Sequence, residues 1–115
     1  MPSDPQAQLT YNDYSLENEP KRNGALALIQ KLMAKGVPIT SVGLQGHDSL
    51  TWPGLEQQDA TIAAFGKLGV KVVISELDID VLPQAANQDT ADITTNIQAN
   101  ASLNPYVNGL PDSVQ

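Results

Sequence analysis

Hydrophobic and polar positions follow two periods along this chain, and each change of period marks a predicted element. The run Val70–Ile74 is β-branched and almost continuously apolar, which is typical of a parallel strand covered on both faces. Shorter alternating runs that end in polar residues predict two further strands, over residues 9–14 and 39–47. The last strand continues to residue 79 and carries two carboxylates near its end.

Two stretches with apolar residues three or four positions apart separate these strands and predict helices. The first helix follows residues 15–20, runs for about fifteen residues and ends before Gly36. Its expected inner stripe is Ala25, Leu28, Ile29, Leu32 and Met33. The second covers residues 55–68, with Leu55, Ile62, Phe65 and Leu68 in helical spacing. The order strand, helix, strand, helix, strand over residues 9–79 predicts an α/β fold with parallel strands and crossover helices.

Residues 80–115 differ in character, because Asn, Gln, Asp and Thr replace the apolar runs. This composition predicts a long polar loop after the 9–79 core. Ile93 and Ile97 fit one short helical turn, and residues 110–113 resemble the entry to a helix.

Each predicted strand ends in a polar pair spaced two residues apart: Asn12 with Tyr14, Gln45 with His47, and Glu76 with Asp78. Strand side chains alternate, so the members of each pair share a face. The carboxyl ends of parallel strands form the ligand-binding edge of α/β folds, and we expect the three pairs to converge there. Amide, phenol, imidazole and carboxylate groups together suit a ligand covered with hydroxyl groups, which indicates carbohydrate. Trp52, in the loop after residue 47, fits either a sugar platform or loop packing.

Charge and composition narrow the class of partner. The 115 residues carry a formal net charge of −7, which argues against a nucleic-acid backbone or an anionic membrane surface. No apolar run is long enough to cross a bilayer, and the first residues do not begin a signal peptide. The absence of Cys excludes thiolate chemistry, and a single His excludes a multi-His metal site. We expect no cofactor.

What remains is carboxylate chemistry. A carboxylate beside a His can attack an anomeric carbon, provided that a second carboxylic acid protonates the leaving oxygen. The plainer interpretations are a solvated strand-end carboxylate for Glu76, a structural role for His47, and pairing with a Lys for Asp78. Asn12 and Tyr14 also fit hydrogen-bonded structural residues. The remaining acids near these elements are expected to be solvated: Asp13, Glu17, Asp48 and Asp80.

Three stretches, in this order and spacing, resemble successive motifs of glycoside hydrolase family 10: Tyr11-Asn12-Asp13-Tyr14, the segment from Pro38 to His47, and Ile74-Ser75-Glu76-Leu77-Asp78-Ile79. Members of that family are chiefly endo-1,4-β-xylanases that retain anomeric configuration on a (β/α)8 TIM barrel. The resemblance implies that residues 9–14, 39–47 and 70–77 are similar to strands five to seven. Residues 1–115 would then be part of a catalytic domain, with 80–115 as an enlarged loop after strand seven.

The resemblance also implies roles for the paired residues. Glu76 is similar to the nucleophile, His47 to the histidine that hydrogen-bonds it, and Asp78 to the aspartate that orients this histidine. Asn12, Tyr14 and Gln45 would line the substrate cleft. The family's general acid/base is a Glu at the end of strand four, and residues 1–8 contain no counterpart.

The implied activity is hydrolysis of internal bonds in xylan or a related β-1,4-glycan, without metal or cofactor. A complete barrel usually takes about 250 residues, so the remainder of the barrel is an expected partner and the isolated chain is expected to be inactive. A secreted or periplasmic location is expected for an enzyme that acts on an insoluble polymer. The alternatives are a noncatalytic β-glycan-binding or assembly module, and a divalent-metal site at Glu76, Asp78 and His47.

Overall fold

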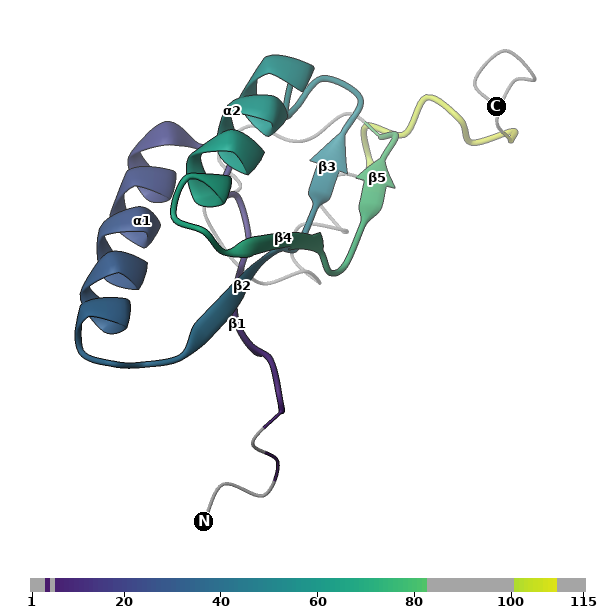
Figure 1. Cartoon of the computed structure of the whole chain (residues 1–115). Helices are drawn as coiled ribbons and strands as arrows, with labels where there is room; N and C mark the ends of the chain where they lie inside the picture. Colours follow the sequence, from purple (N-terminus) through teal and green to yellow (C-terminus); the bar gives the residue numbers. More distant parts are fainter. Residues whose placement is uncertain (1–3, 5, 83–100, 110–115) are drawn as a thin grey trace. The chain divides into compact units, whose positions relative to one another are not determined.

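The computed structural model describes residues 4, 6–82 and 101–109, and the chain divides into compact units at residues 1–80 and 81–115. In chain order the elements are β1 (Leu9–Asp13), α1 (Glu19–Ala34), β2 (Ile39–Leu44), β3 (His47–Ser49), α2 (Leu55–Gly66), β4 (Lys71–Ile74) and β5 (Asp78–Asp80) (Figure 1). No helix in the described ranges combines the length and the apolar character that a membrane span needs.

The second unit is described at residues 81–82 and, over a longer stretch, at residues 101–109. Two turns there are closed by backbone hydrogen bonds, from the Asn104 amide to the Ala101 carbonyl (3.3 Å) and from the Gly109 amide to the Tyr106 carbonyl (3.0 Å). The turn predicted at Ile93 and Ile97 and the helix entry at 110–113 lie outside the described residues. The division into a 9–79 core and an 80–115 loop stays a prediction.

The main sheet has three parallel strands in the order β1-β2-β4, with β2 in the centre. Asn12 of β1 lies opposite Gly43 of β2, and Gly43 lies opposite Val73 of β4. Helix α1 lies in the connection from β1 to β2, and α2 lies in the connection from β2 to β4. Figure 1 shows both helices on the same side of these strands. The predicted parallel strands with crossover helices are therefore present.

The strands predicted over 39–47 and 70–79 are each interrupted. Their continuations, β3 and β5, form a separate parallel pair in which His47 lies opposite Asp78. Residues 45–46 separate β2 from β3, whereas residues 75–77 separate β4 from β5, so the second segment contains one extra residue. An extra residue in one strand acts like a β-bulge and changes the direction of the side chains beyond it. Gly46 makes the bend at a φ of +71°, where a side chain would be strained.

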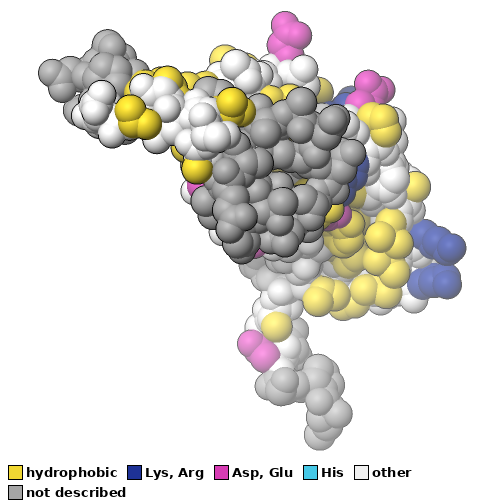
Figure 2. Space-filling view, turned by 180° about the vertical axis from the view of Figure 1, so that it is seen from behind, with side chains coloured by type: hydrophobic (Ala, Val, Ile, Leu, Met, Phe, Trp, Pro, Cys, Tyr) yellow, Lys and Arg dark blue, Asp and Glu magenta, His cyan; other side chains and the backbone are white. Residues whose placement is uncertain are grey.

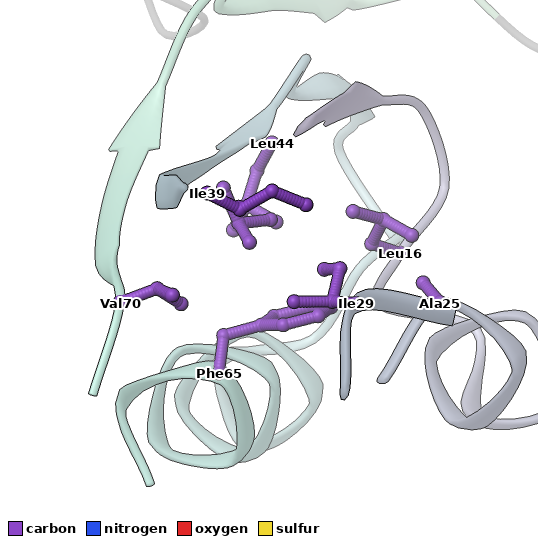
Figure 3. Packing of buried hydrophobic residues seen from close by; sticks show 8 residues of the cluster. Leu16, Ala25, Ile29, Ile39, Leu44, Phe65 and Val70 are labelled. Carbon is purple, nitrogen blue, oxygen red and sulfur yellow. The ribbon is translucent and has the colours of Figure 1, made fainter. Parts of the chain in front are cut away.

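The hydrophobic core lies between the main sheet and the two helices (Figure 3). Phe65 of α2 and Ile29 of α1 are completely buried and point toward the apolar side chains of the strands. The buried hydrophobic residues are Leu16, Ala25, Ile29, Ile39, Val42, Leu44, Phe65 and Val70. Burial of a side chain as large as Phe65 contributes roughly 2–3 kcal/mol. The core thus fixes the sheet whose carboxyl edge carries the site.

The buried stripe of each helix is narrower than the helical spacing predicts. Leu28 and Met33 of α1 are 42% and 38% exposed, and Leu55 at the start of α2 is 85% exposed. Ala25 and Ile29 are buried, while Leu32 is partly buried against the core. The prediction of five inward residues in α1 is wrong because only one side of the helix meets the sheet and α2.

The prediction that β4 is covered on both faces is also wrong for the described residues. Val72 packs against the core, so Val73, the next residue, points to the opposite face and is 48% exposed. Ile74 is exposed to a similar extent. Figure 2 shows hydrophobic side chains gathered at the surface of the molecule. About half of the Val73 side chain is therefore uncovered on this second face of the sheet.

Helix α1 begins with a side-chain cap, and this cap supports a testable prediction. The Asn18 side chain accepts a hydrogen bond from the Lys21 backbone amide (3.2 Å), which would otherwise lack a partner in the first turn. We expect Asn18→Ala to lower the free energy of unfolding by about 1 kcal/mol. Asn23→Ala is the matched control, because Asn23 is exposed within the same helix, where Ala is the better helix former. Urea unfolding followed by circular dichroism should therefore show that Asn18→Ala lowers the free energy of unfolding and that Asn23→Ala raises it.

Candidate active site

Five of the six predicted site residues form one hydrogen-bonded cluster at the carboxyl ends of the strands. His47 lies at its centre. Its Nδ1 is 2.6 Å from Asp78 Oδ2, while its Nε2 is 3.2 Å from Gln45 Oε1 and 3.4 Å from Glu76 Oε2. Asn12 joins from β1, with its Nδ2 3.3 Å from Glu76 Oε1. The predicted convergence of the three strand ends is therefore observed for these residues.

The backbone around the strand interruptions positions these side chains. The Glu76 amide donates to the Gln45 carbonyl (3.1 Å), and the Asp78 amide donates to the Gly46 carbonyl (3.0 Å). These bonds hold the extra residue of the β4–β5 segment against the bend after β2. Glu76 and Asp78 can then approach the two different nitrogens of His47.

The acceptors around His47 constrain the hydrogen bonds of its ring. Asp78 accepts the Nδ1 proton across the 2.6 Å contact. An imidazolium would donate at the same time to Gln45 or Glu76, through Nε2. A neutral ring with its proton on Nδ1 would need Gln45 to turn its amide nitrogen toward Nε2. The imidazolium therefore joins Asp78 and Glu76 in one network, whereas the neutral ring would bond Asp78 and Gln45.

Ser75 is a member of the cluster that the sequence analysis missed. Its hydroxyl donates to Asn12 Oδ1 at 2.7 Å and lies 3.3 Å from the Leu44 carbonyl oxygen. The hydroxyl therefore links Asn12 of β1 to the segment that follows β4. Its position directly before Glu76 was the available signal, but only the strand register shows that Asn12 is within reach.

Tyr14 and Trp52 stand outside this cluster in the part of the chain that the structure describes. Tyr14 follows the end of β1, and the Lys21 ammonium lies 3.3 Å from the centroid of its ring, a cation–π contact. Trp52 is fixed at its backbone by Ser49, whose Oγ accepts from the Trp52 amide (3.1 Å). Trp52 borders a surface hollow together with Arg22 and Glu56. The substrate-binding role of Tyr14 stays a prediction.

Asp13 is engaged in an ion pair rather than solvated. Its Oδ1 is 2.9 Å from Lys21 Nζ, and its Oδ2 accepts from the Tyr11 hydroxyl at 2.8 Å. Burial alone would raise the pKa of Asp13, but the hydrogen bonds from Lys21, Tyr11 and the Tyr14 amide outweigh it and lower this pKa. Burial, followed by the hydrogen bond and charge of Asp13, raises the pKa of Tyr11. Asp13 is therefore held ionised.

Asp48 and Glu17 also differ from the expectation of solvated acids. Glu17 is 4% exposed, and Asp48 Oδ1 is buried with no hydrogen-bond partner among the described residues. The other oxygen of Asp48 accepts from Gln58 Nε2 at 3.0 Å. Burial, reinforced by the negative charge of Asp78, raises the pKa of Asp48. The ionised form of Asp48 thus weakens the fold.

We expect Asp48→Asn to raise the free energy of unfolding at pH 7 by about 1 kcal/mol, because the amide keeps the bond from Gln58 and removes a buried charge. The folded pKa of Asp48 lies above its unfolded value, so the native state binds more protons between the two values. Stability is therefore lost as the pH rises through this window. The gain from Asp48→Asn should vanish below the unfolded pKa of about 3.9. Thermal unfolding of the wild type and of Asp48→Asn between pH 3 and pH 7 measures this gain in stability.

Asp13→Asn is the matched control, for which we expect the opposite change in the free energy of unfolding at pH 7. The folded pKa of Asp13 is lowered, so its contribution to stability is present above the unfolded pKa and is lost as the pH falls through the folded one. The variant should be less stable than the wild type at pH 7 and equal to it in strong acid. Equal pH profiles for the two Asn variants would contradict both assignments.

The cluster leaves its carboxylates accessible and does not gather them around one point. The side chains of His47, Glu76 and Asp78 are 45%, 48% and 62% exposed, so a polymer has access to them. The two carboxylates lie at opposite nitrogens of the ring, where they cannot share one ion with it. No group of three His, Cys, Asp or Glu suited to a metal occurs among the described residues. The arrangement can hold one carboxylate toward a substrate with both of its oxygens contacted.

The comparison with protein families gives a single family for nearly the whole chain. The model of glycosyl hydrolase family 10 matches residues 2–109. The endo-1,4-beta-xylanase A of Xylanibacter ruminicola is 42% identical over 113 residues, which is 98% of this chain and 31% of that protein. The beta-1,4-xylanase of Dictyoglomus thermophilum is 47% identical over 78 residues, which is 68% of this chain and 22% of that protein. The chain thus spans a third or less of the length of these relatives.

Solved structures agree with this assignment. A GH10 endoxylanase from a sugarcane soil metagenome superposes with a TM-score of 0.82 at 38% identity and covers 96% of this chain and 32% of its own. A Thermobacillus composti GH10 xylanase gives a TM-score of 0.68 at 32% identity, covering 87% of this chain and 33% of its own. These matches confirm the predicted partial TIM barrel, which is not closed within the described residues. The chain therefore belongs to glycosyl hydrolase family 10.

Proposed function

We propose that this chain supplies the nucleophile side of the active site of a retaining endo-1,4-β-xylanase. The observation that carries the proposal is the placement of Glu76, with Oε1 3.3 Å from Asn12 Nδ2 and Oε2 3.4 Å from His47 Nε2. Two separate groups thus fix the carboxylate, while about half of its side chain stays open to a ligand. A preorganised carboxylate of this kind suits attack on an anomeric carbon.

In the proposed reaction a Glu76 oxygen forms a bond to the anomeric carbon while the glycosidic C–O bond breaks. The leaving oxygen takes a proton from a carboxylic acid, and the sugar stays attached to Glu76 as an ester. Water then attacks the same carbon, the ester bond breaks, and the proton of the water returns to the acid. Two inversions at one carbon retain its configuration. His47 and Asn12 keep Glu76 aligned during both steps.

The proton donor is proposed to come from another part of the barrel. Asp13 is unsuited to this role, because its ion pair with Lys21 and its lowered pKa keep it ionised. Asp78 contacts His47 Nδ1 on the side of the ring opposite to Glu76. The corresponding acid of the family follows strand four, whereas this chain resembles strands five to seven.

Features of the main sheet support the remainder of the barrel as a partner. Strands β1 and β4 each pair with β2 alone in the described residues, so each keeps one free edge. Val73 of β4 is exposed on the face that points away from the helices. In a closed barrel these edges pair with neighbouring strands and this face is filled by inward side chains. We propose the same completion here, with xylan or a related β-1,4-glycan as the polymer bound at the carboxyl edge.

The test is a graft in which residues 2–109 replace the matching segment of the Xylanibacter ruminicola endo-1,4-beta-xylanase A, here called the grafted xylanase. Proton NMR during hydrolysis of xylohexaose gives the configuration of the first reducing end formed. We expect the β anomer first, followed by slow mutarotation. Initial release of the α anomer would overturn the retaining mechanism.

The 115-residue chain alone serves as the second arm of this test. Without a proton donor paired with Glu76 we expect no xylan hydrolysis by the isolated chain, while the grafted xylanase is active. Hydrolysis by the isolated chain would show that the donor lies within these 115 residues. An inactive grafted xylanase that still binds xylan would favour the noncatalytic β-glycan-binding module instead.

A further inference from the structure

The side chain of Asn12 reaches across the central strand of the sheet. Asn12 belongs to β1 and lies opposite Gly43 of β2, which in turn lies opposite Val73 of β4. Its carboxamide nevertheless contacts Ser75 and Glu76, which follow β4. Strands β1 and β4 are two strand spacings apart, roughly 9.5 Å. The carboxamide can make both contacts only by passing directly over β2.

Gly43 provides the space for this crossing. A Cβ atom added at Gly43 would clash with Asn12 Oδ1 and lie 3.1 Å from Asn12 Cγ. Real Cβ atoms essentially never come as close to a neighbour as this Cβ would come to Oδ1, so Asn12 would have to leave its position. The backbone of Gly43 does not have a positive φ. Glycine is therefore needed here for the neighbouring side chain and not for a turn.

Ser75 determines which end of the Asn12 carboxamide faces Glu76. An ionised carboxylate only accepts hydrogen bonds, so the Nδ2 group is the end that can face Glu76 favourably. Oδ1 then faces Ser75, whose hydroxyl donates to it at 2.7 Å. Turning the amide over would place Oδ1 against the carboxylate, and Ser75 would then have to accept from Nδ2 and donate only to the more distant Leu44 carbonyl oxygen at 3.3 Å. The bond from Ser75 therefore favours the orientation that is useful to Glu76.

We propose that Ser75 and Gly43 are positioning residues that hold Asn12 as a donor to Glu76. Asn12 then fixes Oε1 of Glu76 while His47 contacts Oε2, so the plane of the carboxylate is set from two strands. The functional importance of this arrangement rests on the proposed function, which makes Glu76 the nucleophile. The arrangement itself is measurable without any catalysis.

The first test uses the 115-residue chain labelled with ¹⁵N. The two Hδ2 protons of Asn12 should have well-separated resonances in the wild type, because one faces a carboxylate. We expect Ser75→Ala to reduce this separation at least about twofold, whereas Ser75→Thr, which keeps a hydroxyl, preserves it. Gly43→Ala should also reduce the separation. If that variant does not fold, the comparison of Ser75→Ala with Ser75→Thr is the deciding test. Unchanged Asn12 resonances in Ser75→Ala would overturn the proposal.

Ser41→Ala is the matched control, because the Ser41 hydroxyl also bonds a side chain of β1, but that of Thr10. It should leave the Asn12 resonances as in the wild type, and an equal change in Ser41→Ala and Ser75→Ala would reject a specific role for Ser75.

In the grafted xylanase, Ser75→Ala should lower kcat about fivefold to tenfold at unchanged KM, with Ser75→Thr restoring it. An inactive grafted xylanase with the expected Asn12 resonances would reject the proposed function alone. Full activity in Ser75→Ala would reject the positioning role alone.

Discussion

We expect Glu76→Ala to lower kcat of the grafted xylanase at least about 10⁴-fold, because the proposed covalent step then has no nucleophile. The fold should persist, since the Glu76 side chain is 48% exposed and lies outside the hydrophobic core. Initial rates on xylohexaose measure the loss, and the midpoint of thermal unfolding checks the fold. A large loss of kcat at an unchanged midpoint is the expected pair of results.

Azide separates a nucleophile from a structural carboxylate in this variant. The space vacated by Glu76 admits a small anion that can attack the anomeric carbon from the same side and give an α-glycosyl azide. Such a product, with partial recovery of substrate consumption, requires that Glu76 faces the reacting carbon. Glu56→Ala, in the exposed first turn of α2, is the control for loss of a carboxylate elsewhere. More than a tenth of wild-type kcat in Glu76→Ala would contradict the nucleophile role.

Local chemistry made the order of the elements predictable. Gly36 and Gly69 have φ values of +80° and +78°, as expected for residues just past the ends of helices. The β-branched run before Glu76 forms β4, and its parallel pairing with β2 follows from the crossover through α2. These features depend on residues close together in the chain, which is the range over which periodicity and capping act.

The interruptions of the strands were not predictable in the same way. The alternation through Leu44 and Gln45 continues to His47 without a visible break, yet β2 ends at Leu44 and β3 begins at His47. The cause is the one-residue difference between two segments some thirty residues apart, which appears only when they are paired. The burial predicted for some helix residues was wrong for a related reason. The apolar spacing of Leu55 cannot show which part of a helix another element covers.

The contacts of the site also divide into those that a local sequence pattern predicted and those that it did not. Strand alternation brought Glu76, His47 and Asp78 to one edge, and the structure joins them through the imidazole. The contact between Asn12 and Ser75 spans 63 residues and depends on the missing side chain of Gly43, so no local pattern contains it. Tyr14 satisfied the same alternation rule but contacts Lys21, because β1 ends one residue earlier, at Asp13.

His47 is the point where the two carboxylates are coupled, and its loss is the second large effect that we expect. His47→Ala removes the contact to Glu76 Oε2 and leaves only Asn12 to hold the carboxylate. A displacement of about 1 Å in a reacting group costs roughly 10²-fold in rate, so kcat of the grafted xylanase should fall by about that factor. KM should change little, because the distal sugar contacts stay in place. The midpoint of thermal unfolding should also stay close to that of the wild type, since the ring is 45% exposed.

A double-mutant cycle tests whether Asp78 acts through His47. Asp78 contacts His47 Nδ1 at 2.6 Å, on the side of the ring opposite to Glu76. Asp78→Ala alone should therefore lower kcat by disordering the ring, but in the His47→Ala background it should have no further effect, because the ring is already gone. Losses that multiply in the double variant would mean that Asp78 contributes independently of His47. A wild-type kcat in His47→Ala would remove the imidazole from the mechanism altogether, and Glu76 would then be positioned by Asn12 alone.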